Sequence, residues 1–201
     1  MASKLIIHDV EQGTPEWFLA RDLKMTASEA KTIATGGKGL MTYCRRLVLE
    51  HILPNNRQTL TTPDMDRGHL LEPEARKWYS SVMDREVRTV GFIEKDKYTG
   101  CSPDGLIGED GGLEIKSPSD KTFLDYVVDG GYNPDYYWQC QMSMLVTGRK
   151  WWDLVLYNPN YKQVAIIERI KADKKAFADL KQGLTKGKKE IERLLKIVKA
   201  N

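Results

Sequence analysis

The stretch "GCSPDGLIGEDGGLEIKSP", Gly100–Pro118, decides the fold that we expect for this chain. It carries two carboxylates, Asp104 and Glu114, and one amine, Lys116. Between them lies the run "GEDGG" (108–112), which is rich in residues that reverse the chain. The sequence therefore predicts an antiparallel strand pair that brings the three charged side chains close together.

Alternation along the second strand separates its two faces. In "GLEIKS", Leu113 and Ile115 point to one face, and Glu114 and Lys116 share the other. Two neighbouring carboxylates repel each other unless a cation lies between them. Hard oxygen ligands select Mg²⁺ or Mn²⁺, and such a cation polarises a phosphodiester and activates bound water. In this arrangement Lys116 orients or deprotonates the attacking water, or neutralises charge on the phosphate.

Each half of this pattern has an ordinary structural interpretation. An Asp in "PDG" is most often a turn residue, and "EIK" is most often the solvated face of a strand. Their combination at hairpin spacing favours a metal-dependent site.

The bulk composition sets the broad class of protein. A chain of 201 residues with 41% hydrophobic and 29% charged residues suits one domain spanning residues 1–201. Its three cysteines are widely spaced, which indicates neither a disulfide framework nor a zinc site and favours a reducing, cytoplasmic environment. No signal-type or membrane-spanning segment is recognisable, so we expect no membrane association.

The remaining pattern predicts an α/β (α+β) fold with a central mixed β-sheet flanked by helices. A helix over residues 25–37 begins with a capping box, Thr26 and Glu29, and ends at Gly36. Pro73 either marks the first turn of the third helix or kinks it, and residues 170–199 form a basic amphipathic C-terminal helix. The other helices are expected over residues 41–53, 67–83, 119–131 and 133–148, and the strands over 86–93, 98–108, 111–118, 151–159 and 163–170.

The ordered blocks "TASE", "RGHLLEPEAR", "SPDG", "LEIK" and "YWQCQMSMLVTG" resemble one family. They are similar to the YqaJ-type viral recombinase, or phage lambda exonuclease-like, family of PD-(D/E)XK nucleases. The resemblance runs from Arg21 to Pro159. It implies a restriction endonuclease-like core.

The resemblance also implies roles for individual residues. Asp104, Glu114 and the carbonyl of Ile115 match metal ligands, and Lys116 matches the catalytic lysine. Glu72 matches the helix-borne acid of the metal site, although on the residues alone it is a surface glutamate that pairs with Arg76.

Two further groups of residues match the family pattern. Gln139 matches a glutamine near the catalytic centre, and Gln141 is the competing candidate. Arg21, Ser28 and Ser102 match residues that hold the 5′ phosphate of a DNA end. Ser28 suits this role in the first turn of a capped helix, where free N–H groups attract anions.

These expectations define a Mg²⁺-dependent exonuclease, with Mn²⁺ as a possible substitute. The resemblance implies that it degrades one strand of double-stranded DNA from its ends, in the 5′→3′ direction, and leaves a 3′ single strand for annealing-type recombination. The resemblance further implies a homotrimeric ring, a single-strand annealing protein as partner, and a phage or prophage origin in a bacterial cytoplasm. The alternatives are an endonuclease of the same fold and a non-catalytic protein that binds DNA ends.

Overall fold

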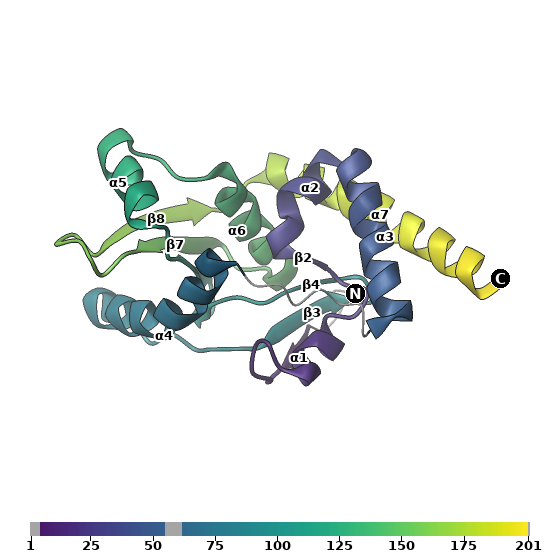
Figure 1. Ribbon diagram of the computed structural model, residues 1–201, viewed down its shortest axis with the longest axis horizontal. Helices are drawn as coiled ribbons and strands as arrows, with labels where there is room; N and C mark the ends of the chain where they lie inside the picture. The colour runs from purple at the N-terminus through teal and green to yellow at the C-terminus, as the bar shows by residue number, and fades with distance from the viewer. Residues whose placement is uncertain (1–4, 55–61, 201) are drawn as a thin grey trace.

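The computed structural model describes residues 5–54 and 62–200, and of residues 63 and 64 only the backbone. The first half of the chain holds several consecutive helices and short strands, and the second half holds the longer strands and a long final helix (Figure 1). In chain order the elements are β1 (Ile6–His8), α1 (Pro15–Ala20), β2 (Met25–Thr26), the 3₁₀ helix η1 (Ala27–Glu29), α2 (Ala30–Thr35), α3 (Lys38–Ile52), α4 (Pro63–Met83), β3 (Phe92–Asp96), β4 (Thr99–Cys101), β5 (Gly105–Ile107), β6 (Gly111–Lys116), α5 (Asp120–Asp129), α6 (Pro134–Thr147), β7 (Trp151–Tyr157), β8 (Ala165–Lys171) and α7 (Lys174–Ala200).

The strands form two four-stranded mixed sheets, in the orders β1-β3-β4-β2 and β5-β6-β7-β8. The predicted α/β class, with helices flanking mixed β-sheet, is confirmed. The sequence predicted one central sheet, and the structure has two. The division falls in the stretch expected as one strand over residues 98–108. There the chain leaves the first sheet after β4, passes through Ser102, Pro103 and Asp104, and enters the second sheet at β5. Pro103 has no N–H to donate to a strand ladder, so the interruption falls where pairing is weakest.

The predicted hairpin forms the edge of the second sheet. β5 and β6 pair antiparallel with Gly105 opposite Leu113, and the chain reverses through residues 108–110. β6 then pairs in parallel with β7, and β7 pairs antiparallel with β8. The parallel pair requires a crossover, which the helices α5 and α6 supply.

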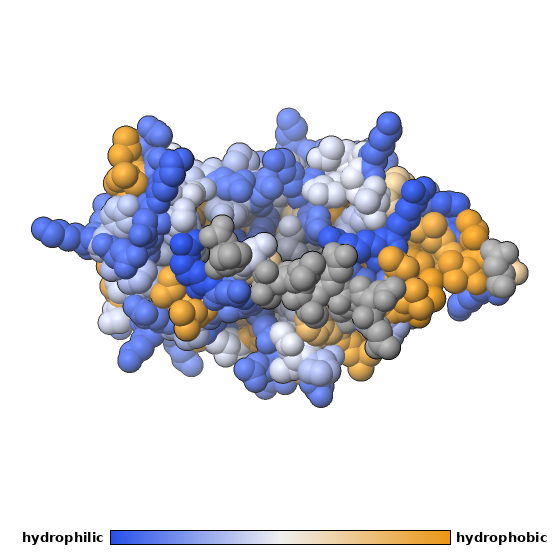
Figure 2. All heavy atoms as spheres, in the orientation of Figure 1, coloured by the Kyte–Doolittle hydropathy of each residue, from blue (hydrophilic) through white to orange (hydrophobic). Residues whose placement is uncertain are grey.

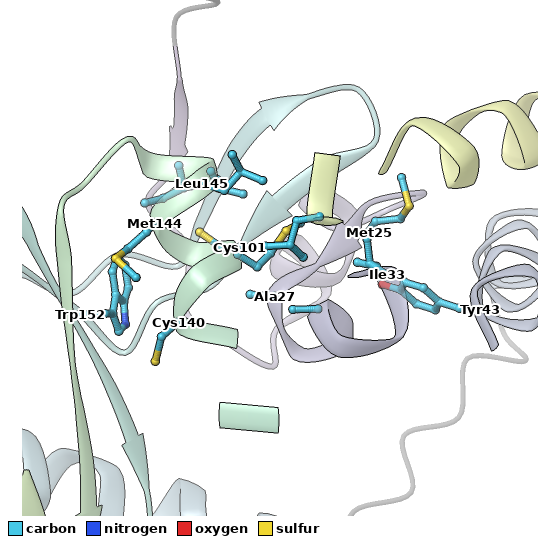
Figure 3. Packing of buried hydrophobic residues seen from close by; sticks show 14 of the residues in the cluster. Met25, Ala27, Ile33, Tyr43, Cys101, Cys140, Met144, Leu145 and Trp152 are labelled. Atoms are coloured by element: carbon cyan, nitrogen blue, oxygen red, sulfur yellow. The ribbon is translucent and has the colours of Figure 1, made fainter. Parts of the chain in front are cut away.

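Helices cover both faces of this second sheet. On one face Ala75 and Tyr79 of α4 pack with Leu113, Ile115 and other side chains of the sheet. On the other face Trp152 of β7 packs with residues of α6 (Figure 3). The alternation predicted for β6 therefore holds, since its apolar side chains face α4 and its charged side chains face the opposite way.

The larger core lies between the first sheet and the helices α2, α3, α6 and α7. Figure 3 shows Met25, Ile33, Tyr43 and Cys101 within it, each from a different element. All three cysteines are buried and free. Apolar side chains also gather over the free end of α7 (Figure 2), where Ile197 and Val198 are 46% and 43% exposed.

Several local expectations are wrong. Residues 25–37 do not form one capped helix: Met25 and Thr26 pair with β4, and Thr26 makes no side-chain cap. Glu29 pairs with Arg46 instead of closing the capping box. The stop at Gly36 is confirmed, since this residue ends α2 in the left-handed conformation.

Helix α4 begins earlier than expected and continues through its proline. Thr62 caps it by accepting a hydrogen bond from the N–H of Met65, and Pro73 lies inside the helix. The strands and helix before residue 27 (β1, α1 and β2) were not predicted, because each is too short to show a period. No helix in residues 5–54 and 62–200 is long and apolar enough to cross a membrane.

Close packing of α7 on α2 depends on a glycine. A Cβ at Gly183 would lie 1.8 Å from the carbonyl oxygen of Ile33, a backbone atom that cannot move alone. We therefore expect Gly183→Ala to lower the free energy of unfolding by about 1–3 kcal/mol, despite the better helix propensity of alanine. Urea unfolding measures this change. Gly68→Ala, in α4, is the matched control because its Cβ meets nothing within 4 Å. Equal stability of the two variants would contradict the packing described.

Candidate active site

Three charged side chains converge where β5, β6 and α6 meet. The ammonium of Lys116 lies 2.7 Å from Oε1 of Glu114, and Nε2 of Gln139 donates to the same oxygen at 2.5 Å. Asp104 precedes β5, and its Oδ2 accepts a hydrogen bond of 2.6 Å from the N–H of Ile115. The hairpin thus places Asp104 directly beside the strand that carries Glu114 and Lys116.

The two candidate glutamines of α6 have different environments. Gln139 reaches Glu114, whereas Gln141 is fully buried and bonds the backbone at Lys171 and Asp173. Gln141 therefore joins α6 to the region where β8 gives way to α7, and Gln139 is the glutamine that lies at the site.

Helix α4 brings a third carboxylate to the same place. Glu72 forms an ion pair with Arg76 one turn later, and Arg76 also donates through Nε to the carbonyl oxygen of Asp104 at 2.8 Å. The helix-surface pair considered from sequence is thus present, and it lies against the site.

Burial gives these acids unusual proton affinities. Desolvation raises the pKa of Glu114 to about 8, with Asp104 and Glu72 adding repulsion against the attraction of Lys116. Desolvation and the charge of Asp104 raise the pKa of Glu72 to about 7. Desolvation also raises the pKa of Asp104. The neighbouring carboxylates outweigh burial at Lys116 and raise its pKa, so this amine is a cation at neutral pH.

One carboxylate oxygen at this site is unsatisfied. Oε2 of Glu114 is buried and has no hydrogen-bond partner in the described part of the chain. Asp153, the buried acid of β7, provides a contrast: Arg169 contacts both of its oxygens at 2.8 Å, and Tyr79 donates to one of them. An acid that only supports the fold is fully paired, whereas Glu114 keeps one oxygen available.

This donor set fits a hard divalent cation. Three carboxylates share one site with two cationic side chains, and one buried carboxylate oxygen has no partner. Within residues 5–54 and 62–200, no three His, Cys, Asp or Glu side chains already converge closely enough to hold a metal ion. The reason is visible in their contacts: Glu72 is turned to Arg76, and one oxygen of Glu114 is turned to Lys116 and Gln139.

The residues matched to phosphate binding lie at the other end of the same region. Arg21, at the end of α1, donates to Oγ of Ser102 at 3.2 Å and stacks on the ring of Trp17 at 4.0 Å. The indole N–H of Trp17 donates to the same hydroxyl at 2.9 Å. Ser28 is exposed and lies 3.2 Å from the hydroxyl of Thr26.

The helical argument for Ser28 is wrong. Ser28 lies in the three-residue 3₁₀ helix η1 and not in the first turn of an α-helix. It can therefore bind an anion through its hydroxyl, without help from a helix N-terminus. What places it near Ser102 is the parallel pairing of β2 with β4.

A single cleft of about 550 Å³ is lined by every residue matched to a catalytic, metal or phosphate-binding position of the family. Arg21, Ser28 and Ser102 line one part of it, and the carboxylates and Lys116 line another part, where Arg67 and Ser117 also lie. Its lining includes the nine residues Arg21, Ser28, Glu72, Ser102, Asp104, Glu114, Ile115, Lys116 and Gln139.

Other residues of the cleft were missed from the sequence. Trp17 and His69 were not among the residues singled out from the sequence, yet both line the cleft. Tyr136, one turn before Gln139, places its ring 5.3 Å from the ammonium of Lys116. The signal for Trp17 was its spacing of four residues from Arg21, which puts both on one face of a helix.

The chain is similar to proteins of one known family. The YqaJ-like viral recombinase domain matches residues 16–150. The alkaline exonuclease (LHK-Exo) of Laribacter hongkongensis is 31% identical, with a TM-score of 0.84 over 93% of this chain and 97% of that one. The same enzyme is also known in complex with dAMP. No match was found among curated protein sequences.

A more distant structure shares the fold alone. A phage-related exonuclease of Haemophilus somnus is 13% identical, with a TM-score of 0.64 over 87% of this chain and 96% of that one. With the domain match covering most of the chain and the site residues gathered in one cleft, this chain belongs to the YqaJ-like viral recombinase domain family.

Proposed function

We propose that this protein is a Mg²⁺-dependent exonuclease that degrades one strand of duplex DNA from its ends in the 5′→3′ direction. Its family and its 31% identity to an alkaline exonuclease make the chain a deoxyribonuclease. The observation that carries the proposal is the single cleft that joins an acidic, lysine-containing end to an arginine- and serine-containing end.

The acidic end would hold the cation. Asp104, Glu114, Glu72 and the carbonyl of Ile115 are its proposed ligands, with Mg²⁺ as the resident ion and Mn²⁺ as a substitute. When bound, the cation supplies charge to polarise the scissile phosphodiester and to activate a water molecule. Oε2 of Glu114 is suited to it, because Lys116 and Gln139 already occupy the other oxygen.

Lys116 acts as a charge partner in this proposal. Its raised pKa keeps the ammonium protonated, so it is placed to neutralise the negative charge that builds on the phosphate as the bond breaks. Gln139 fixes the rotamer of Glu114 and thereby the position of the lysine. A role of Lys116 as general base would require its pKa to fall, which the neighbouring carboxylates oppose.

The basic end would receive the DNA terminus. Arg21 is held by stacking on Trp17 and by Ser102, so its guanidinium is oriented toward the cleft before substrate arrives. A terminal 5′ phosphate is the group that such a donor set recognises, with Ser28 as a further hydroxyl donor. The proposed 5′→3′ direction itself comes from the family resemblance, and a pocket for the 5′ phosphate is consistent with it.

The cellular role follows from the family resemblance. We propose that the 3′ single strand left by digestion is passed to a single-strand annealing protein for recombination. On the same basis we propose a ring-shaped homotrimer around DNA, in a phage or prophage that acts in a bacterial cytoplasm.

Replacing the lysine tests the catalytic assignment. Lys116→Ala should lower turnover on linear duplex DNA with Mg²⁺ by at least about 100-fold, because charge developing in the transition state loses its partner. Binding of the same DNA, measured with chelator present, should change by less than about threefold, since the interaction strengthens mainly during the reaction. The control is Lys150→Ala, an exposed lysine paired with Asp110. Turnover near the wild-type value would overturn the assignment, and cutting of covalently closed circles would indicate an endonuclease.

Replacing the arginine tests the recognition of the end. The wild-type enzyme should digest 5′-phosphorylated ends faster than 5′-hydroxyl ends. Arg21→Ala should reduce that preference by roughly tenfold to a hundredfold. A loss of this size corresponds to the free energy of one or two charge-assisted hydrogen bonds. Initial rates on the two substrates measure the effect, with Arg193→Ala on α7 as an exposed control. Equal wild-type rates on both ends would remove the phosphate pocket from the proposal.

The raised carboxyl pKa values predict a pH dependence for metal binding. A carboxyl whose folded pKa lies above its unfolded pKa stabilises the protein at low pH, and this stability is lost as pH rises through the folded value. For Glu72 and Glu114 these values are about 7 and about 8. Mg²⁺ binds the ionised acids, so it should raise the melting temperature more at about pH 8.5 than at about pH 6. Glu114→Gln should abolish most of the difference, and a pH-independent effect of Mg²⁺ would exclude these ligands.

A further inference from the structure

Arg76 links the two parts of the proposed cation site that come from different elements. Its guanidinium forms an ion pair with Glu72 of α4 and donates through Nε to the backbone carbonyl of Asp104 at 2.8 Å. One arginine therefore contacts the side chain of one proposed ligand and the backbone of another.

Asp104 is consequently fixed from two directions. Arg76 holds its carbonyl oxygen, and the N–H of Ile115 holds its carboxylate at 2.6 Å. Its backbone is therefore fixed whether or not a cation is bound. Glu72 differs, because among the described residues its carboxylate contacts only Arg76, and a carboxylate held only at its tip can rotate.

Two hollows meet at this point. Glu72 and Asp104 line both the catalytic cleft and a second hollow of about 700 Å³, whereas Arg76 lines the second hollow and not the cleft. Glu72 thus stands in the wall between them, with Arg76 behind it. Rotation of its carboxylate toward the cleft would take it away from Arg76 and toward Asp104 and Glu114.

We propose that Arg76 is a positioning residue that occupies Glu72 in the metal-free protein and releases it to the divalent cation. It neutralises Glu72 beside two other acids until the cation arrives, and it keeps Asp104 in place throughout. Its guanidinium competes with the cation for Glu72, so it weakens cation binding while keeping the site assembled. This inference rests on the proposed metal site.

A purely structural arginine would behave differently. Arg149 provides the example, since its guanidinium donates to the carbonyls of Ile107, Gly108 and Gly111 at the β5–β6 turn. Loss of such an arginine lowers stability by the same amount with and without metal. Loss of Arg76 should lower the stability of the metal-free protein more, because only there does it balance the charge of Glu72.

The test is a direct titration of the full-length protein with Mn²⁺ by calorimetry at one alkaline pH, with no DNA present. Arg76→Gln should bind Mn²⁺ roughly threefold to tenfold more tightly than wild type, because a competing positive charge is gone. Arg76→Lys keeps that charge and should stay within about twofold of wild type. Arg149→Gln is the matched control and should leave Mn²⁺ affinity unchanged.

The second measurement is the free energy of unfolding of each variant, in chelator and in saturating Mn²⁺. Arg76→Gln should lose more stability in chelator than in Mn²⁺, and should regain its fold on addition of Mn²⁺ if it is unfolded without it. Equal losses in both conditions, weaker Mn²⁺ binding, or failure to regain the fold would overturn the inference. Absence of Mn²⁺ binding by the wild type would overturn the metal site itself, whereas equal binding by wild type and Arg76→Gln overturns only the role of Arg76.

Discussion

The hydrogen bond from the N–H of Ile115 to the carboxylate of Asp104 is the contact on which the site depends. It joins the segment between the two sheets to the strand that carries Glu114 and Lys116. A bond of 2.6 Å between the half-buried carboxylate of Asp104 and the buried backbone N–H of Ile115 is strong, because a carboxylate is a good acceptor and water has limited access to the pair. Without it, the proline-containing connection from β4 to β5 would lose its direct side-chain link to β6, and the carboxylate of Asp104 would no longer be held beside Glu114.

The cluster around this contact is costly for the fold and suited to its proposed task. Burying Glu114, Asp104 and Glu72 together raises the pKa of each, which means that the folded state resists their ionisation. Lys116 and Arg76 offset part of this repulsion. The repulsion that they do not offset would be relieved when a cation binds the ionised carboxylates. Metal affinity and folding stability would therefore be linked.

The sequence predicted those parts of the molecule that depend on local pattern. Alternation and turn residues were sufficient for the β5–β6 hairpin and for the shared face of Glu114 and Lys116. Local sequence pattern was insufficient wherever a contact between distant parts of the chain determines the structure. Pairing of Met25 and Thr26 with β4 overrode the capping box. The second contact of Arg76 was equally hidden, because its partner is a backbone carbonyl and carries no sequence signal.

The division into two sheets also sets the dimension of the cleft. Only Pro103 separates Ser102, at the proposed phosphate end, from Asp104, at the proposed cation end. Two residues of chain span at most about 7 Å, a distance of the same order as that between neighbouring phosphates along a DNA strand. Pro103 fixes one backbone angle of this span, which limits how far the two ends can drift apart. A terminal phosphate at Arg21 and Ser102 would therefore bring the first internal phosphodiester to the acids, which is the geometry required for release of one nucleotide at a time.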